Sequence, residues 1–342
     1  MQEYVGLDVH KKFIFAVVLD GEGKVLREKK IKNEPWELDK FFKGVNKDVP
    51  IALESCSCWE YVYDYLVDSG FSEVVLATPS KIRLIATSRK KTDAHDARVI
   101  ADLLRCNMLP RSYAPPSVIR EQRLLTRHRI SLGRQKSIVK NKIHSILIRN
   151  GINQDFDDIF SVQGINFLRS IDLSFIDRYK MDQNLELIRH FDVQIQKTEN
   201  MIQDYVQHSP ETKLIMTIPG ISYYSGCTIT GEIGDIRRFN DARKLTSFAG
   251  LNPSVSQSGN RCHTGRISKQ GNKNIRWMLN QCANVAIMHD KTLAKIYHRI
   301  KKRKGHNIAI TAVARKMLCC IYTMLTQNIS YQALQIHKAK AS

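Results

Sequence analysis

The stretch YVGLDVHKKFIFAVVLD, residues 4–20, is dominated by apolar, aromatic and β-branched side chains. It divides into two strand-like runs, Tyr4–Asp8 and Phe13–Asp20, and a glycine turn at 21–23 leads into a third run, Lys24–Ile31. Runs joined by such short turns are typical of neighbouring antiparallel strands. The chain is therefore predicted to open with three strands of one sheet.

Strand and helix patterns alternate in the residues that follow. Ile51–Glu54 and Val74–Ala77 are short apolar runs, with a helical pattern between them at Tyr61–Val67. Another helix is expected from Thr92, after which apolar residues recur at helical spacing. We therefore expect an α/β domain over residues 1–110, built as a mixed sheet flanked by helices.

The remainder of the chain is predicted to be mostly helical. Residues 111–211 form a candidate arm, because a long basic helix up to about residue 150 could pair with a second helical stretch near Asn184–Gln207. The segment between these helices gives only weak signals. A mostly α C-terminal domain is expected over residues 212–330, with a loop-rich segment from Gly250 to Gly271, and residues 331–342 are expected to be a frayed tail.

The charge balance is strongly basic. The 342 residues include 53 Lys and Arg against 33 Asp and Glu, which gives a formal charge of +20. Neutralisation of phosphates by Lys and Arg is the sequence-independent part of nucleic-acid binding, so such an excess favours nucleic acid as the partner. A solvated basic surface and affinity for anionic lipid are the alternatives.

The cysteines and the apolar stretches favour a cytoplasmic protein. The eight cysteines include no CxxC pair and no zinc-type spacing. The most apolar late stretch, Ile308–Leu325, is interrupted by Arg315 and Lys316, and the chain begins without a charged-then-apolar leader. We expect no disulfide and no membrane partner.

Acidic residues stand at the ends of the predicted core strands. Asp8 ends the first strand and Glu54 a later one, while Asp93 and Asp96 are spaced to share one face of the helix after Thr92. An acid at the end of an apolar strand is costly to bury unless it is paired or binds a metal. We expect the four to converge on Mg²⁺ or Mn²⁺, since paired divalent ions can activate a nucleophile at phosphorus.

Each acid also has a plainer interpretation. A lone acid at a strand end usually meets solvent, and Asp93 could be a favourable first-turn acid of its helix. His10 and His95 lie beside the acids and are expected on the strand surface and the helix surface. The order of the four acids is the stronger signal, because it matches the ribonuclease-H-like arrangement.

Two segments carry a family resemblance. Gly6-Leu7-Asp8-Val9-His10-Lys11 and Lys91-Thr92-Asp93-Ala94-His95-Asp96-Ala97 resemble the signatures of the DEDD insertion-sequence transposases, which are related to Piv-type DNA invertases and RNA-guided bridge recombinases. The resemblance implies a domain similar to the RuvC Holliday-junction resolvase over residues 1–110. It also implies a catalytic and metal-binding tetrad of Asp8, Glu54, Asp93 and Asp96.

The C-terminal half resembles the second domain of the same family, whose Gly-Leu-x-Pro and Ser-Gly segments carry an essential serine. Ser258 is the matching position, with Ser256 as the alternative. A serine hydroxyl needs activation to attack phosphorus, and we expect Arg261 or Lys269 to stabilise the charge that develops.

Several positions are expected to contact nucleic acid. The Pro219-Gly220 turn resembles the hairpin of helix-hairpin-helix modules, whose backbone N–H groups can hold a phosphate. Two basic stretches, one on the arm and one after the serine, would face phosphates. The candidates are Arg123, Arg127, Arg134, Lys140, Gly220, Arg261, Arg266, Lys269 and Lys273.

Together these features predict a bacterial or archaeal, nucleoid-associated transposase that exchanges DNA strands through a serine–DNA covalent intermediate. The resemblance further implies double-stranded DNA at the element ends and target, a structured non-coding guide RNA, and a homodimer or homotetramer. A site-specific DNA invertase and a RuvC-like junction-resolving nuclease are the enzymatic alternatives. A nucleic-acid-binding protein with an inactive ribonuclease-H-like fold is the non-enzymatic one.

Overall fold

The computed structural model describes residues 2–85, 92–258 and 261–340, without the side chains of residues 255, 256, 258, 261–264 and 337–340. The chain divides into two compact units, Met1–Ala114 and Pro115–Ser342, which we call the N-terminal and C-terminal units. The helices of the expected arm belong to the same unit as the C-terminal helices.

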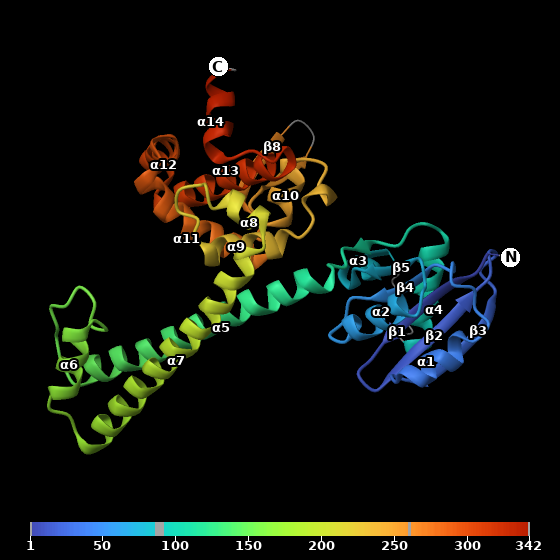
Figure 1. The fold of residues 1–342 in the computed structure, drawn as a ribbon, viewed down its shortest axis with the longest axis horizontal. Coiled ribbons are helices and arrows are strands. Elements are labelled where there is room, and N and C mark those ends of the chain that lie inside the picture. The colour runs from blue at the N-terminus through green and yellow to red at the C-terminus, as the bar shows by residue number, and fades with distance from the viewer. Residues whose placement is uncertain (1, 86–91, 259–260, 341–342) are drawn as a thin grey trace. The chain divides into compact units, whose positions relative to one another are not determined.

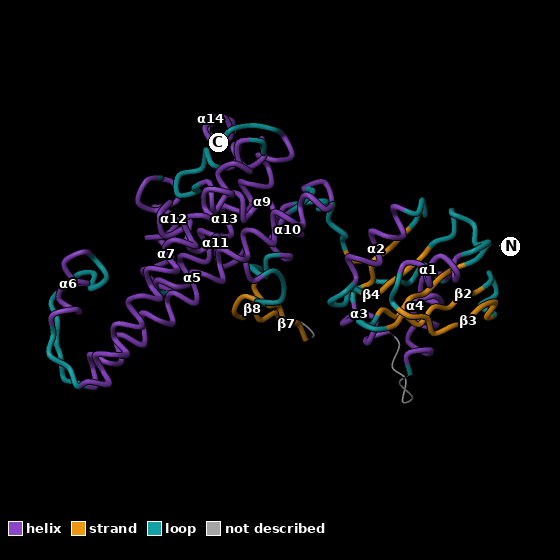
Figure 2. Tube along the Cα trace, turned by 60° about the horizontal axis from the view of Figure 1, so that its bottom comes forward, coloured by secondary structure: helices purple, strands orange, loops and turns teal. Residues whose placement is uncertain are grey.

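The described part of the N-terminal unit contains a six-stranded sheet with the order β3-β2-β1-β4-β5-β6 (Figures 1 and 2). Its first three strands are antiparallel neighbours, β1, β4 and β5 are parallel, and β6 is antiparallel to β5. The strands are β1 Tyr4–Val9, β2 Phe13–Leu19, β3 Val25–Lys32, β4 Ile51–Glu54, β5 Val74–Ala77 and β6 Arg111–Ser112.

Helices cover both faces of this sheet, which confirms the predicted α/β class. On one face Leu7 and Leu53 pack in a buried cluster with Leu38 of α1 and Leu66 of α2. On the other face Ala52 packs with apolar residues of α4. The helices are α1 Pro35–Phe42, α2 Trp59–Asp68, α3 Pro79–Ile85 and α4 Asp93–Arg105.

The C-terminal unit begins with two long helices, α5 (Ser117–Arg149) and α7 (Phe175–Gln207), which lie side by side and antiparallel (Figure 1). Three inter-helix ion pairs hold their register: Arg129–Glu199, Lys136–Asp192 and Arg149–Asp177. The predicted pairing is therefore observed. The weakly predicted segment contains α6 (Val162–Ser170) and the first turns of α7, which begins after the N-cap Ser174.

The other helices of this unit pack around one buried core that includes Ile229, Leu279 and Leu318. The segment expected to be loop-rich instead contains a two-stranded antiparallel hairpin, β7 and β8. The elements are α8 Pro210–Ile215, α9 Tyr223–Ile233, a 3₁₀ turn Ile236–Arg238, α10 Ala242–Phe248, β7 Pro253–Ser258, β8 Arg261–Ile267, α11 Lys273–His289, α12 Lys291–Lys304, α13 His306–Gln327 and α14 Tyr331–Lys340.

The end of the chain differs from the frayed tail that its composition suggested. It forms α14, whose Tyr331 and Leu334 are buried in the core, and the Tyr331 hydroxyl donates a hydrogen bond to Asp290 at 2.8 Å. Among the described residues, α13 is the helix long and apolar enough to cross a membrane. Half of its apolar window is nevertheless buried inside this unit, as in the core helix of a folded domain.

Candidate functional site

The ends of β1 and β4 bring the first two acids to the same face of the sheet. The strands are parallel, with Gly6 opposite Ala52 and Leu7 opposite Leu53, so Asp8 and Glu54 are the next residues on adjacent strands. Gly6 and Ala52 both face α4. Since side chains alternate along a strand, Asp8 and Glu54, two residues further on, face the α4 side as well.

The helix α4 supplies the other two acids from its first turn. Thr92 caps the helix by accepting a hydrogen bond from the His95 backbone N–H at 3.2 Å, and Asp93 and Asp96 follow directly. The helix lies very close to β1, because an added methyl group at Gly6 would stand 2.6 Å from the backbone nitrogen of Ala101. This close packing carries the first turn of α4 toward Asp8.

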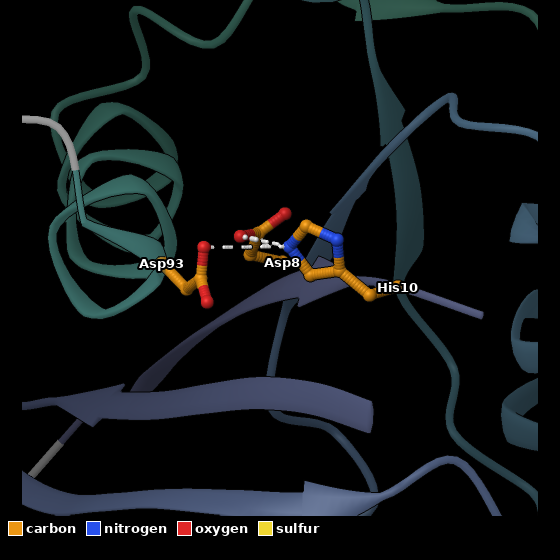
Figure 3. Close-up of side chains that lie close together, drawn as sticks. All are labelled: Asp8, His10 and Asp93. Atoms are coloured by element: carbon orange, nitrogen blue, oxygen red, sulfur yellow. Dashed lines mark hydrogen bonds and ion pairs between the residues drawn. The ribbon is translucent and has the colours of Figure 1, made fainter. Parts of the chain in front are cut away.

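A histidine completes the cluster. The Nε2 atom of His10 lies 3.0 Å from Asp8 Oδ2 and 3.6 Å from Asp93 Oδ1 (Figure 3). The three side chains form a group whose ligand atoms all lie within 4.8 Å of one another. His10 was expected on the strand surface, and its side chain is indeed 43% exposed, but its ring is turned toward the acids.

The electrostatics of Asp8 reflect this crowding. Burial raises the pKa of the Asp8 carboxyl, whereas the hydrogen bond and charge of His10 lower it. The negative charges of Asp96 and Asp93 raise the pKa further, and the net effect is an increase. The charges of Asp93 and Asp96 therefore repel the charge of Asp8, and a bound cation would relieve that repulsion. Carboxylate oxygens with one imidazole form a donor set that suits a divalent metal ion.

The candidate serine lies on the hairpin of the C-terminal unit. Ser258 is the last residue of β7 and pairs in register with Arg261 of β8, while Ser256 pairs with His263. The side chains of Ser256, Ser258 and Arg261 lie outside the described residues. The basic residues that follow, Arg266, Lys269 and Lys273, have exposed side chains.

Two arginines of the arm are bound within the chain. Arg127 makes a two-pronged ion pair with Glu232, with Nε–Oε1 and Nη2–Oε2 distances of 2.7 and 2.8 Å. Arg123 donates to the backbone carbonyl oxygens of Gly231 and Glu232 at 2.6 and 3.0 Å. These contacts give the two guanidinium groups a structural role at the junction of α5 and α9.

Sequence reasoning missed the residue at the centre of this junction. Glu232 has no exposed surface, and its carboxylate also accepts hydrogen bonds from Asn272 at 2.6 Å and Asn274 at 3.0 Å. Burial raises the pKa of Glu232, but the bonds from Arg127 and the two asparagines outweigh burial and hold the pKa below its ordinary range. Asn272 is also the N-cap of α11, so Glu232 ties the arm to the segment that follows the β7–β8 hairpin.

The other predicted contact positions divide between packing and exposure. Gly220 has a φ of +90°, and an added methyl group there would lie 2.7 Å from both Cys282 O and Ala286 N of α11. The turn therefore packs tightly on α11. On the arm Arg134 is exposed, and the Lys140 ammonium lies 4.2 Å from the centre of the Phe160 ring.

Family models match both units. A model described as a transposase, of the IS110 DEDD type, matches residues 5–150, and one described as the transposase IS116/IS110/IS902 family matches residues 212–298.

Curated relatives match along most of the chain. The transposase for insertion sequence element IS1111A of Coxiella burnetii is 24% identical over 96% of this chain and 91% of the relative. The transposase for element IS1328 of Yersinia enterocolitica is 22% identical over 95% of this chain and 97% of the relative. The pilin gene-inverting protein of Moraxella bovis is 31% identical over 41% of this chain and 46% of the relative.

Proposed function

Since this chain belongs to the DEDD insertion-sequence transposases of the IS110 type, which are DNA-cleaving and recombining enzymes, we propose that it exchanges DNA strands through a serine–DNA intermediate at a metal-dependent site. One observation carries this proposal. Asp8 and Asp93 are far apart in the sequence of the N-terminal unit, yet they belong to one group of possible metal ligands.

The topology of the N-terminal unit supports a ribonuclease-H-like, RuvC-like assignment. Three antiparallel strands are followed by parallel strands in the order β3-β2-β1-β4-β5, with acids at the ends of the central strands β1 and β4. The closing helix α4 brings Asp93 and Asp96 to the same edge. The sequence predicted a mixed sheet of this general kind, and the positions of the acids on it support the ribonuclease-H-like assignment.

The donor set fits divalent ions, Mg²⁺ or Mn²⁺. Asp8, Glu54, Asp93 and Asp96 would hold them, and the pKa of Asp8 is raised by burial first and by the charges of Asp96 and Asp93 next, both of which a bound cation would offset. When bound, paired divalent ions supply charge stabilisation to the attacking and leaving oxygens at phosphorus. The carboxylate groups are held in place because the strands of the sheet and α4 share a packed core.

Ser258 is proposed as the nucleophile. Its Oγ forms a bond to a DNA phosphorus while the bond from that phosphorus to one deoxyribose oxygen breaks, and the leaving oxygen takes up a proton. A hydroxyl end of another strand then attacks the phosphoserine and releases the serine, so the number of phosphodiester bonds is unchanged. Exposed Lys269, with Arg261, would stabilise the charge on the phosphoryl oxygens.

Guide RNA, oligomerisation and location follow from the family resemblance. A structured non-coding RNA would pair with donor and target DNA, and two duplexes held at once favour a homodimer or homotetramer. The exposed arm residue Arg134 and the exposed Arg266 and Lys273 are suited to phosphate contact. We place the protein in the cytoplasm, at the nucleoid.

The test is denaturing electrophoresis of labelled element-end DNA with protein, Mg²⁺ and RNA transcribed from the flanks of the element. Wild type should give a protease-sensitive protein–DNA adduct, which Ser258→Ala and Asp93→Asn should each abolish. Ser256→Ala is the matched control for the serine. Asp102→Asn is the control for the acid, because Asp102 lies on the same helix but is exposed and paired with Arg105.

Two outcomes would assign another function. Free cleaved ends that survive Ser258→Ala but not Asp93→Asn would indicate a metal-dependent nuclease. Inversion of a DNA segment between two sites, without excision, would indicate an invertase, which the similarity to the pilin gene-inverting protein favours as the second candidate.

A further inference from the structure

The imidazole of His10 lies where a ligand of the metal site would lie. Its Nε2 atom is 3.0 Å from Asp8 Oδ2 and 3.6 Å from Asp93 Oδ1, and the ring points between the two carboxylates (Figure 3). The two carboxylates attract the imidazole, and in this position its Nε2 atom belongs to one group with Asp8 and Asp93 whose ligand atoms could share an ion.

These separations match the spacing of ligands around one ion. With metal–ligand bonds of about 2.1 Å, neighbouring ligands of an octahedral ion stand ~3 Å apart. The distance from His10 to Asp8 already has this value, and the distance to Asp93 exceeds it by an amount that a small side-chain rotation can close.

The ring is held in this orientation from behind. It stacks on Phe13, with ring centres 4.6 Å apart and planes inclined by 28°, and the Lys30 ammonium lies 3.7 Å from the centre of the Phe13 ring. The backbone of His10 is also fixed, since its N–H donates to Phe13 O at 2.9 Å and its carbonyl accepts from Asn33 Nδ2 at 3.0 Å. A preorganised imidazole loses little freedom when it binds an ion.

We propose that His10 is a direct metal ligand, binding one ion together with Asp8 and Asp93, and that it shifts the preference of the site from Mg²⁺ toward Mn²⁺ and later transition ions. In the bound form Nε2 offers its lone pair and the ring proton resides on Nδ1. The preference follows because imidazole nitrogen binds transition ions well, whereas Mg²⁺ prefers oxygen ligands. This inference rests on the proposed metal-dependent function.

The direct test is electron spin-echo envelope modulation of Mn²⁺ bound to the full chain. Wild type should show coupling of Mn²⁺ to a histidine ring nitrogen, and its frequencies should change when the protein is labelled with ¹⁵N-histidine. The coupling should vanish in His10→Gln and persist in the matched control His95→Gln, because His95 stands in the first turn of α4 but is not a member of the Asp8–His10–Asp93 ligand group.

A competition measurement tests the preference. We expect His10→Gln to weaken Mn²⁺ binding by at least about 10–100-fold, the range found when a residue that only supports a metal ligand is replaced. His10→Asp should restore binding through an oxygen ligand, and Mg²⁺ should then displace Mn²⁺ at lower concentration than in wild type.

The outcomes separate this inference from the proposed function. Mn²⁺ that binds in an Asp8-dependent manner without nitrogen coupling would overturn the role of His10 and leave the metal-dependent function standing. Mn²⁺ binding that is equally weak in wild type and Asp8→Asn would instead remove the metal site itself.

Discussion

Gly6 of β1 and Ala101 of α4 meet backbone to backbone, since a methyl group added at Gly6 would lie 2.6 Å from the Ala101 nitrogen. This contact sets the distance between the strand that carries Asp8 and the helix that carries Asp93. Any side chain at position 6 must push α4 away from the sheet, and with it one half of the candidate metal site.

Gly6→Ala should therefore weaken metal binding without touching a ligand. We expect a loss of about 1–3 kcal/mol of stability from overpacking, and a smaller rise in melting temperature on adding Mn²⁺ than in wild type. Gly21→Ala is the matched control, because the nearest atom to an added methyl group there is 3.9 Å away. A Gly6→Ala protein with wild-type metal stabilisation would contradict this account.

The metal-free protein should lose stability as the pH rises through the folded-state pKa of Asp8. Burial is the main cause of this raised pKa. As the pH rises from the ordinary pKa of an aspartate to the pKa of Asp8 in the folded protein, the unfolded chain loses the Asp8 proton first, and the folded state loses stability. Asp8→Asn should remove this contribution. In EDTA the variant should be more stable than wild type at neutral pH, with the difference shrinking as the pH falls, as thermal melts across the pH range would show. A difference that grows toward acid would have the wrong sign.

Glu232→Gln should destabilise the C-terminal unit by about 3 kcal/mol. That is the low end for removing one partner of a buried ion pair, because the Arg127 side chain is 46% exposed and can still reach water. The lowered pKa of Glu232 also gives the direction of the pH dependence. The carboxylate stabilises the folded protein above the ordinary pKa of a glutamate, and this stabilisation is lost as the pH falls through the pKa that Glu232 has in the folded protein.

Urea unfolding at two pH values would measure both effects of the Glu232 substitution. Asp235→Asn is the control, because the Asp235–Arg237 pair is exposed and should change stability by less than about 1 kcal/mol. An equal decrease in the free energy of unfolding for the two substitutions would mean that the buried Glu232 junction stabilises the unit no more than an exposed ion pair does.

Gly220→Ala should cost more stability than Gly151→Ala. Both glycines have positive φ, +90° and +65°, so both substitutions carry backbone strain of about 1–2 kcal/mol. Only Gly220 also packs on a neighbouring helix, whereas an added methyl group at Gly151 meets nothing within 4 Å. Chemical denaturation of the two variants measures the difference in the free energy of unfolding. Equal losses would mean that packing on α11 does not require glycine at position 220, and would favour phosphate contact as the reason for it.

The corner between α12 and α13 should contribute to nucleic-acid affinity. Residues 301–304, Lys-Lys-Arg-Lys, are all exposed, and the Tyr297 hydroxyl contacts His306 Nδ1 at 2.8 Å across the corner and stiffens it. Replacing residues 301–303 by Gln should make the slope of log affinity for DNA against log salt concentration shallower, by the amount expected for about three phosphate contacts. Fluorescence anisotropy over a range of salt concentrations measures this slope.

The control for this charge change lies on α7. Gln at Lys180, Arg189 and Lys197 removes the same number of exposed positive charges from a helix that also carries several acids. If both triple variants lose the same slope, net charge and not the corner is responsible.

The strands and acids of the N-terminal unit could be predicted because each signal is local. Apolar β-branched runs identified β1 and β2, and Asp8 and Glu54 follow paired residues of the adjacent strands β1 and β4. The orientation of His10 could not be predicted from strand alternation, because β1 ends at Val9 and the ring is held by its packing on Phe13.

The C-terminal unit resisted prediction where its contacts are distant in sequence. Glu232 and Arg127 are 105 residues apart, and a single acid in a helix gives no indication of its partner. The strands β7 and β8 are mostly polar on both faces, so they lack the alternation that marks a half-buried strand. Burial of Tyr331 depends on the shape of the core that receives it.

The antiparallel register of α5 and α7 limits how genes of this kind can change in length. Arg129, Lys136 and Arg149 each pair with one acid on α7. Inserting about one heptad into α5 alone would shift basic residues of α5 out of reach of their acidic partners. We therefore expect a longer arm to need equal numbers of added residues in both helices. Insertions and deletions in this segment should therefore be inherited in pairs, on opposite sides of the α6 region.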